Sequence, residues 1–170
     1  MAEGPLTCNA LVVGLEAYHT YFTHATRDLK GYVLENNGVE LDFRFDFEFV
    51  ARSAWRSANS RHYDLFFIDG SCDTEVRLGR DLSEALKDLY PNTPIVGMSF
   101  MGQYFRSDKE AALRYDIMVD SQGFSTKSLA KILEELGFLP QGRETREGKR
   151  EEKEEKLRGD PQAGRFMDEW

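Results

Sequence analysis

Four short runs of apolar residues are spaced along the first 120 residues of the chain, at 9–14, 65–68, 95–100 and 117–119. Nearly uninterrupted apolar runs of this length are typical of parallel strands that are buried on both faces. Residues 39–49 instead alternate strictly between apolar and polar side chains. A period of two predicts a strand with one buried and one wet face, at a sheet edge or in a partly exposed position.

The segments between these runs have the spacing of amphipathic helices, in which apolar residues recur about every 3.6 positions. We expect helices at about 16–34, 49–61, 75–89, 108–115 and 126–136. Gly38 suits a left-handed helix stop, and Ser125 suits a helix N-cap. The helix at 49–61 is expected to bury Val50, Ala54, Trp55 and Ala58. The alternation of strands and helices predicts an α/β fold, a doubly wound five-stranded parallel sheet with helices on both faces.

Residues 141–170 differ in composition from the rest of the chain. Apart from Ala163, their only apolar residues are Leu157, Phe166, Met167 and Trp170. A segment this polar does not bury enough surface to fold by itself. We therefore expect one folded domain at 1–140 and a charged tail at 141–170 that is disordered or partly helical. The alternative is a docking peptide, because Phe166, Met167 and Trp170 fall within one helical turn with two acids between them.

The formal net charge of −8 narrows the choice of partners. Nucleic-acid binders and basic membrane-surface proteins need clustered Lys and Arg, so we expect neither nucleic acid nor membrane as a partner. The sequence has no apolar run of about 18 residues, and its first residues do not have the pattern of a secretory signal. Cys8 and Cys72 do not make a disulfide framework. These features predict a soluble, cytoplasmic protein.

The main chemical candidate is Asp69, which follows the buried run at 65–68. It is expected at the carboxyl end of a central strand, the edge of an open α/β sheet where ligands collect. A carboxylate there can accept a phosphoryl group, hold a metal, or do neither. Other candidates are weaker, because His19 and His24 lie on different helix faces and no His is close to Cys72 in sequence. The turn at 14–18 offers neither a dinucleotide fingerprint nor a P-loop.

The order and spacing of these features over about residues 9–139 resemble the receiver domain of two-component response regulators. Residues 11–13 resemble the first strand of the family, and Asp69 resembles its phosphoacceptor. Ser99 resembles the switch hydroxyl after the fourth strand, and Phe124-Ser125 resembles the start of the fifth helix. The resemblance implies a flavodoxin-like fold with strand order 2-1-3-4-5, which places the alternating strand at an edge.

The sequence departs from the family at the residues that support phosphorylation. The family has two adjacent acids after its first strand, which help to hold Mg²⁺; here Gly14 and Leu15 stand there, with only Glu16 close by. The family's lysine after the fifth strand is also missing, since residues 116–126 contain no Lys. Mg²⁺ binds through one or two carboxylates, and the added phosphoryl charge needs a cationic partner. Asp69 is therefore either a working phosphoacceptor or an inherited carboxylate.

We favour a signal-transduction protein of the divergent pseudo-receiver type, which is not an enzyme, uses no cofactor and acts by binding a protein partner. The alternative is an atypical response regulator that is phosphorylated on Asp69, with Ser99 as its switch hydroxyl and Mg²⁺ held by Glu16 and Asp69. A small flavodoxin-fold enzyme is the third reading. The candidate partner-binding residues come from the family's output face and from the tail: Gln103, Tyr104, Phe105, Tyr115, Phe166, Met167 and Trp170.

Overall fold

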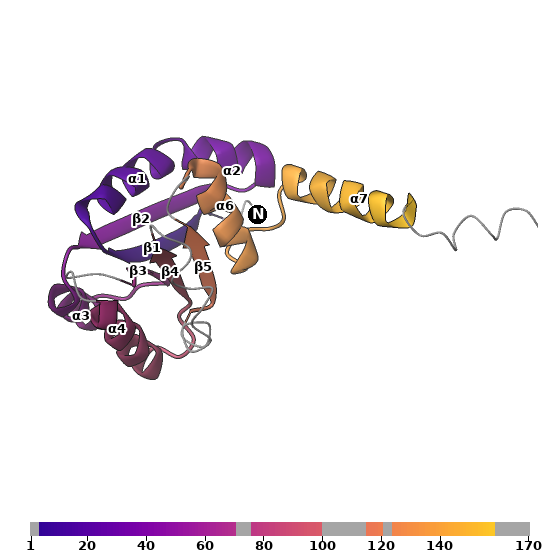
Figure 1. Ribbon diagram of the computed structural model, residues 1–170. Helices are drawn as coiled ribbons and strands as arrows, with labels where there is room; N and C mark the ends of the chain where they lie inside the picture. Colours follow the sequence, from indigo (N-terminus) through magenta and orange to yellow (C-terminus); the bar gives the residue numbers. More distant parts are fainter. Residues whose placement is uncertain (1–3, 71–75, 100–114, 121–123, 159–170) are drawn as a thin grey trace, which may run out of the picture.

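The computed structural model describes residues 4–70, 76–99, 115–120 and 124–158 of the 170-residue chain. Its centre is a five-stranded parallel sheet (Figure 1). The strands are β1 (Leu6–Val13), β2 (Leu41–Glu48), β3 (Leu65–Asp69), β4 (Ile95–Ser99) and β5 (Ile117–Asp120). Their order in the sheet is β2-β1-β3-β4-β5, and every neighbouring pair is parallel. The predicted fold class, the strand order and the edge position of the alternating strand are confirmed.

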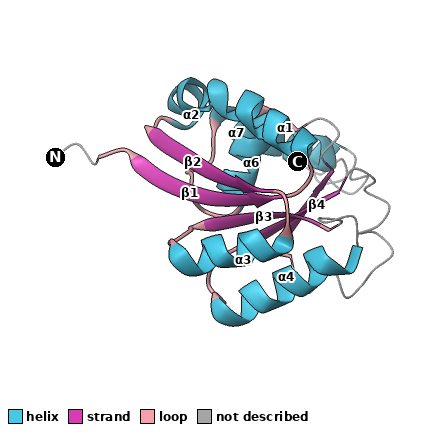
Figure 2. Cartoon of the chain, turned by 90° about the vertical axis from the view of Figure 1, so that its left-hand side faces the viewer, coloured by secondary structure: helices cyan, strands magenta, loops and turns pink. Residues whose placement is uncertain are grey.

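Helices cover both faces of the sheet, as the alternating pattern predicts (Figure 2). The described helices are α1 (Glu16–Arg27), α2 (Leu29–Asn37), α3 (Ala51–Ser60), α4 (Val76–Leu89), α6 (Thr126–Glu135) and α7 (Arg143–Arg158). α1, α2 and α6 lie on one face of the sheet, and α3 and α4 lie on the other. The helix predicted at 108–115 falls outside the described residues. None of the described helices is long and apolar enough to cross a membrane.

The single helix predicted at 16–34 is wrong, because the structure has two helices there. The break falls at Asp28, whose backbone has φ −106° and ψ 2°. Just before it, the hydroxyl of Thr26 donates to the carbonyl of Phe22 at 2.8 Å. A bond from a Thr side chain to the preceding turn competes with the helix backbone and bends the helix. The stop at Gly38 is confirmed, with a left-handed φ of 76°.

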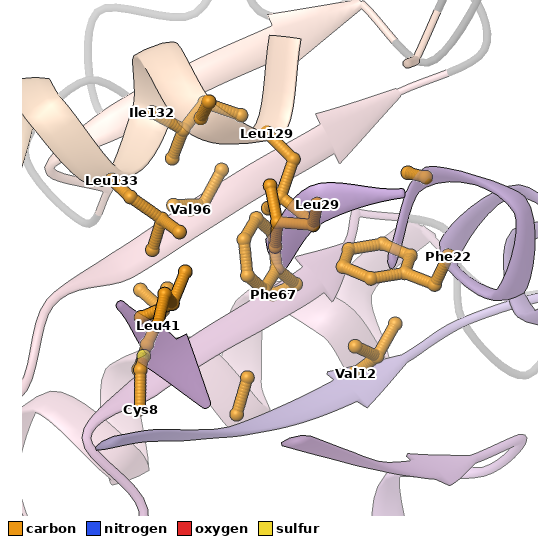
Figure 3. Close-up of a cluster of buried hydrophobic side chains, with 14 of the residues drawn as sticks. Cys8, Val12, Phe22, Leu29, Leu41, Phe67, Val96, Leu129, Ile132 and Leu133 are labelled. Carbon is orange, nitrogen blue, oxygen red and sulfur yellow. The ribbon is translucent and has the colours of Figure 1, made fainter. Parts of the chain in front are cut away.

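The larger apolar core lies between the sheet and α1, α2 and α6 (Figure 3). The rings of Phe22 in α1 and Phe67 in β3 meet edge to face there, with their centroids 4.8 Å apart. Leu129 and Leu133 of α6 are fully buried against the same core. Burial raises the pKa of the Cys8 thiol to about 12, so this side chain stays protonated and packs as an apolar group.

α3 and α4 enclose a smaller core on the other face of the sheet. α3 approaches the sheet through Ala54 and Ala58, which are both buried as predicted. The prediction that this helix also buries Val50 and Trp55 is wrong, since they are 45% and 36% exposed. Val50 precedes the helix in an extended conformation. Trp55 is one residue beyond Ala54, and each residue turns a helix by about 100° away from the buried stripe.

The segment after residue 140 begins with α7, which polar side chains attach to the domain. Glu134 of α6 accepts hydrogen bonds from Asn37 Nδ2 at 2.7 Å, the Gly142 amide at 3.0 Å and Thr145 Oγ1 at 2.7 Å. The attachment is polar because α7 has almost no apolar residues with which to pack. The domain boundary expected at 140 stays a prediction.

Glu134→Ala should destabilise the chain, because it removes the acceptor of three donors at the junction of α2, α6 and α7. We expect a loss of roughly 1–3 kcal/mol in the free energy of unfolding and faster amide exchange at Gly142. Denaturant unfolding and hydrogen exchange measure the two effects. Glu135→Ala, at the exposed neighbouring position, is the matched control. Equal effects of the two substitutions would show that the junction is not held in this way.

Candidate functional site

The main candidate residues lie together at the carboxyl edge of the sheet. β3 ends at Asp69, β4 at Ser99 and β5 at Asp120. The register pairs Asp69 with Met98 and Ser99 with Asp120, so these strands end side by side. Asp69 is 1% exposed and Ser99 is 8% exposed. The carboxylate and the hydroxyl thus occupy neighbouring strand ends, which is the arrangement that the resemblance implies.

A glycine of α4 that the sequence analysis did not single out fixes the backbone at Asp69. A Cβ atom at Gly79 would overlap the carbonyl oxygen of Asp69 and would lie 2.9 Å from the carbonyl carbon of Gly70. The helix therefore packs directly on the end of β3, and only a residue without a side chain permits this approach. The available signal was an isolated glycine inside a helical pattern, which often has a packing reason.

Gly14, at the position where the family has an acid, lies against Asp69 and Tyr18. A Cβ atom at Gly14 would be 3.0 Å from Cβ of Asp69 and 2.9 Å from Cδ2 of Tyr18. Tyr18, in the first turn of α1, is only 1% exposed. Its ring occupies the space into which a side chain at position 14 would project. A carboxylate at this position therefore requires Tyr18 or β3 to move.

Among the described residues, Gly14 and Leu15 stand where the receiver family has the acid pair that helps to hold Mg²⁺. Mg²⁺ demands a near-octahedral shell of oxygens, usually one or two carboxylates with waters. Within the described part of the chain, no three His, Cys, Asp or Glu side chains are grouped to hold a metal. Glu16, the predicted second ligand, is exposed at the start of α1, and its role stays a prediction. The Oδ2 atom of Asp69 is buried and accepts no hydrogen bond, although the residue is engaged in other contacts.

Two lysines among the described residues, Lys87 and Lys127, face carboxylates other than Asp69. Lys87 Nζ lies 2.6 Å from Oδ2 of Asp116, and Lys127 forms an ion pair with Glu144 of α7. The hydrogen bond to Glu144 raises the pKa of Lys127, and the same contact lowers the pKa of the Glu144 carboxyl. Both ammonium groups are therefore committed to a partner that is not Asp69.

Tyr115, which the sequence predicts on a partner-binding face, is only 7% exposed. Its ring packs on Gly97 of β4, where a Cβ atom would come within 2.8 Å of it. Its hydroxyl accepts a hydrogen bond from Ser83 Oγ at 3.3 Å. The role of Tyr115 in partner binding stays a prediction. The other predicted partner-binding residues lie outside the described part of the chain: Gln103, Tyr104, Phe105, Phe166, Met167 and Trp170.

Solved receiver domains have the same fold as this chain. No protein-family model matches the sequence, and no curated protein is similar enough to count as a match. The CheY-like receiver domain from Methylobacillus flagellatus is 23% identical with a TM-score of 0.57, over 76% of this chain and 98% of that one. The chemotaxis response regulator CheY4 of Vibrio cholerae is 15% identical with a TM-score of 0.59, at the same coverage of both chains.

A longer protein also contains a similar domain. NtrX from Brucella abortus is 23% identical over 87% of this chain, with a TM-score of 0.55, but this chain spans only 29% of NtrX. At these identities the likeness is one of fold. The resemblance to CheY-like receiver domains is confirmed at that level: this chain has the receiver fold.

Gly14→Ala should destabilise the protein, because its methyl group would press on Tyr18 and Asp69. We expect a loss of roughly 1–3 kcal/mol in the free energy of unfolding. Gly31→Ala is the matched control, because a Cβ atom in that helix meets nothing within 4 Å. Alanine is the better helix former, so this variant should gain about 0.5–1 kcal/mol. Denaturant unfolding separates the two, and a Gly14→Ala variant as stable as wild type would contradict the contact.

Proposed function

We propose that this chain is a signalling protein of the pseudo-receiver type, which binds a protein partner without phosphorylation of Asp69. The receiver fold supports a signalling role, since the similar structures are described as response regulators and not as enzymes. The contact of Gly14 with Tyr18 and Asp69 carries the second half of the proposal. It places an aromatic ring and a bare glycine where a receiver needs a metal-binding acid.

The chemistry of phosphoryl transfer explains why that contact matters. Transfer depends on positioning the reacting groups and on neutralising the charge of the equatorial oxygens. A divalent cation and a lysine supply that neutralisation in the receiver family. Here the ring of Tyr18 occupies the space that an acidic side chain at position 14 would need. Lys87 and Lys127 are paired with carboxylates other than Asp69. An acyl phosphate on Asp69 would form slowly and would lack charge stabilisation.

Asp69 has instead the surroundings of a packed structural residue. Its backbone is fixed by Gly79, its Cβ atom lies beside Gly14, and the side chain is almost wholly buried. In this role the shape of the side chain matters more than its nucleophilicity. Communication with a partner then depends on surfaces of the domain, and it needs no cofactor.

An atypical response regulator that is phosphorylated on Asp69 is the second candidate. The positions of Asp69 and Ser99 on neighbouring strand ends favour it. In this case Glu16 and Asp69 would hold Mg²⁺, which supplies charge neutralisation when it is bound. The two candidates differ in whether the edge of the sheet binds a divalent cation.

Titration with Mg²⁺ and beryllofluoride, followed by amide shifts at residues 14–16 and 69–70, tests the proposal. We expect no saturable shift, because the acid position is filled. A receiver domain with an intact acid pair serves as the positive control for the reagent. Saturation by Mg²⁺ below about 1 mM, a binding free energy beyond roughly −4 kcal/mol, would favour the phosphorylated response regulator instead.

Asp69→Asn should preserve both the fold and the affinity for a partner identified by pull-down from native lysate. The substitution is nearly isosteric and removes only the charge and the nucleophile. The measurement is the dissociation constant for wild type and variant, with and without acetyl phosphate and Mg²⁺. A shift of about tenfold, or roughly 1.4 kcal/mol, that depends on the phosphodonor and disappears in the variant would overturn the proposal.

A further inference from the structure

Helix α3 has an outer face that combines an aromatic side chain with two cations. Residues 52, 55 and 56 are neighbours on one side of the helix, because side chains three and four positions apart lie next to each other. Arg52 and Arg56 are exposed, and Trp55 is 36% exposed. Figure 2 shows α3 beside α4, on the face of the sheet away from α1, α2 and α6. The outer side of α3 is therefore not part of either core.

Two exposed apolar residues come directly before the helix, but the first of them does not belong to this face. Phe49 is 53% exposed and Val50 is 45% exposed. The ring of Phe49 rests against Phe47, with centroids 5.0 Å apart, and Phe47 in turn packs on His19 of α1. Phe49 therefore lies towards the α1 face of the sheet and not over α3. We call the three neighbouring residues Arg52, Trp55 and Arg56 the α3 surface.

The charge of the α3 surface indicates what it binds. α3 contains two arginines and no acid, although the whole chain has a net charge of −8. Other exposed cations, such as Lys30 and Arg44, lie close to a carboxylate. Neither Arg52 nor Arg56 forms an ion pair or a hydrogen bond with any described residue. Guanidinium groups bind carboxylates and stack on aromatic rings, so the matching ligand is an acidic segment with large apolar side chains.

The chain itself contains a segment with this chemistry. Residues 166–170 read Phe-Met-Asp-Glu-Trp, three large apolar side chains around two acids. The two acids match Arg52 and Arg56 in number and are opposite to them in charge, and the large apolar side chains suit contact with the exposed ring of Trp55. Figure 1 shows α7 leading the chain away from the domain on the side remote from α3. We propose that residues 166–170 of one copy bind the α3 surface of a second copy.

The proposal predicts weak and concentration-dependent association. A short segment with two aromatic anchors makes a small contact, and single contacts of this size bind weakly. If two copies exchange their segments, the second contact forms within the complex at a high effective concentration and strengthens the dimer. Such an exchange closes with two-fold symmetry, whereas a one-way contact continues as an open chain. The proposal stands on the α3 surface and does not depend on whether Asp69 is phosphorylated.

A charge exchange in the full-length chain tests the pairing directly. Sedimentation velocity between about 10 and 500 µM, the range in which contacts of micromolar affinity respond, measures the dissociation constant. We expect the wild type to associate. Arg52→Glu/Arg56→Glu should raise the dissociation constant at least tenfold, and Asp168→Lys/Glu169→Lys should do the same. The chain that carries all four substitutions should regain association within about threefold of wild type.

Arg27→Glu/Lys131→Glu is the matched control, because it makes the same change of net charge at two exposed residues on the other face of the sheet. It should leave association unchanged. Circular dichroism confirms that each variant is folded. The proposal is overturned if the wild type stays monomeric up to the highest concentration. A monomer in which residues 166–170 bind the domain of the same copy would count as this outcome. It is also overturned if the control weakens association as much as the α3 variant, or if the four substitutions together do not restore it.

Discussion

Asp69 is enclosed by two glycines, Gly14 after β1 and Gly79 in α4, and this close packing constrains everything else at the carboxyl edge of the sheet. Neither glycine has room for a side chain, so the helix and the strand ends approach as backbone. The approach buries the carboxylate almost completely and ties the end of β3 to β4, where the Gly70 amide donates to the Met98 carbonyl at 3.2 Å. A side chain added at Gly14 or Gly79 would push apart the strand end and the helices that meet at this edge.

The same packing governs position 14, where the receiver family has an acid. A metal-binding acid at position 14 would have to displace Tyr18, which is part of the larger core. An acid at position 14 and the buried ring of Tyr18 therefore exclude each other in this packing. Apolar burial of the ring stabilises this end of the sheet and needs no ligand.

The sequence predicts the features that depend on local patterns. Apolar runs locate the buried strands, and strict alternation locates the edge strand β2, because burial on one or both faces leaves a period in the chain. The break at Asp28 was missed because the apolar spacing continues across it, while the change is in the backbone angles of Asp28 itself. The exposure of Trp55 was missed because it is next to Ala54, and at the edge of a helical stripe the pattern does not decide which side is inward.

Contacts between residues far apart in sequence explain what the pattern could not predict at the site. The sequence shows that Gly14 stands where the family has an acid. Its contact with Asp69, however, spans 55 positions and follows from the strand order. Glu134 and Asn37, which hold the start of α7, are 97 positions apart and carry no periodic signal. Such contacts are visible only after the chain is folded, because each depends on where two elements meet and not on the residues around it.

The two helix layers use their side chains differently where they pack on the sheet. α1, α2 and α6 pack through large residues, so most of their bulk is committed to the core. α3 packs through Ala54 and Ala58, and its larger side chains are left outside. Alanine contacts bring the helix close to the sheet without using Arg52, Trp55 or Arg56. A helix that is anchored by its smallest residues leaves its larger side chains available for contacts outside the domain.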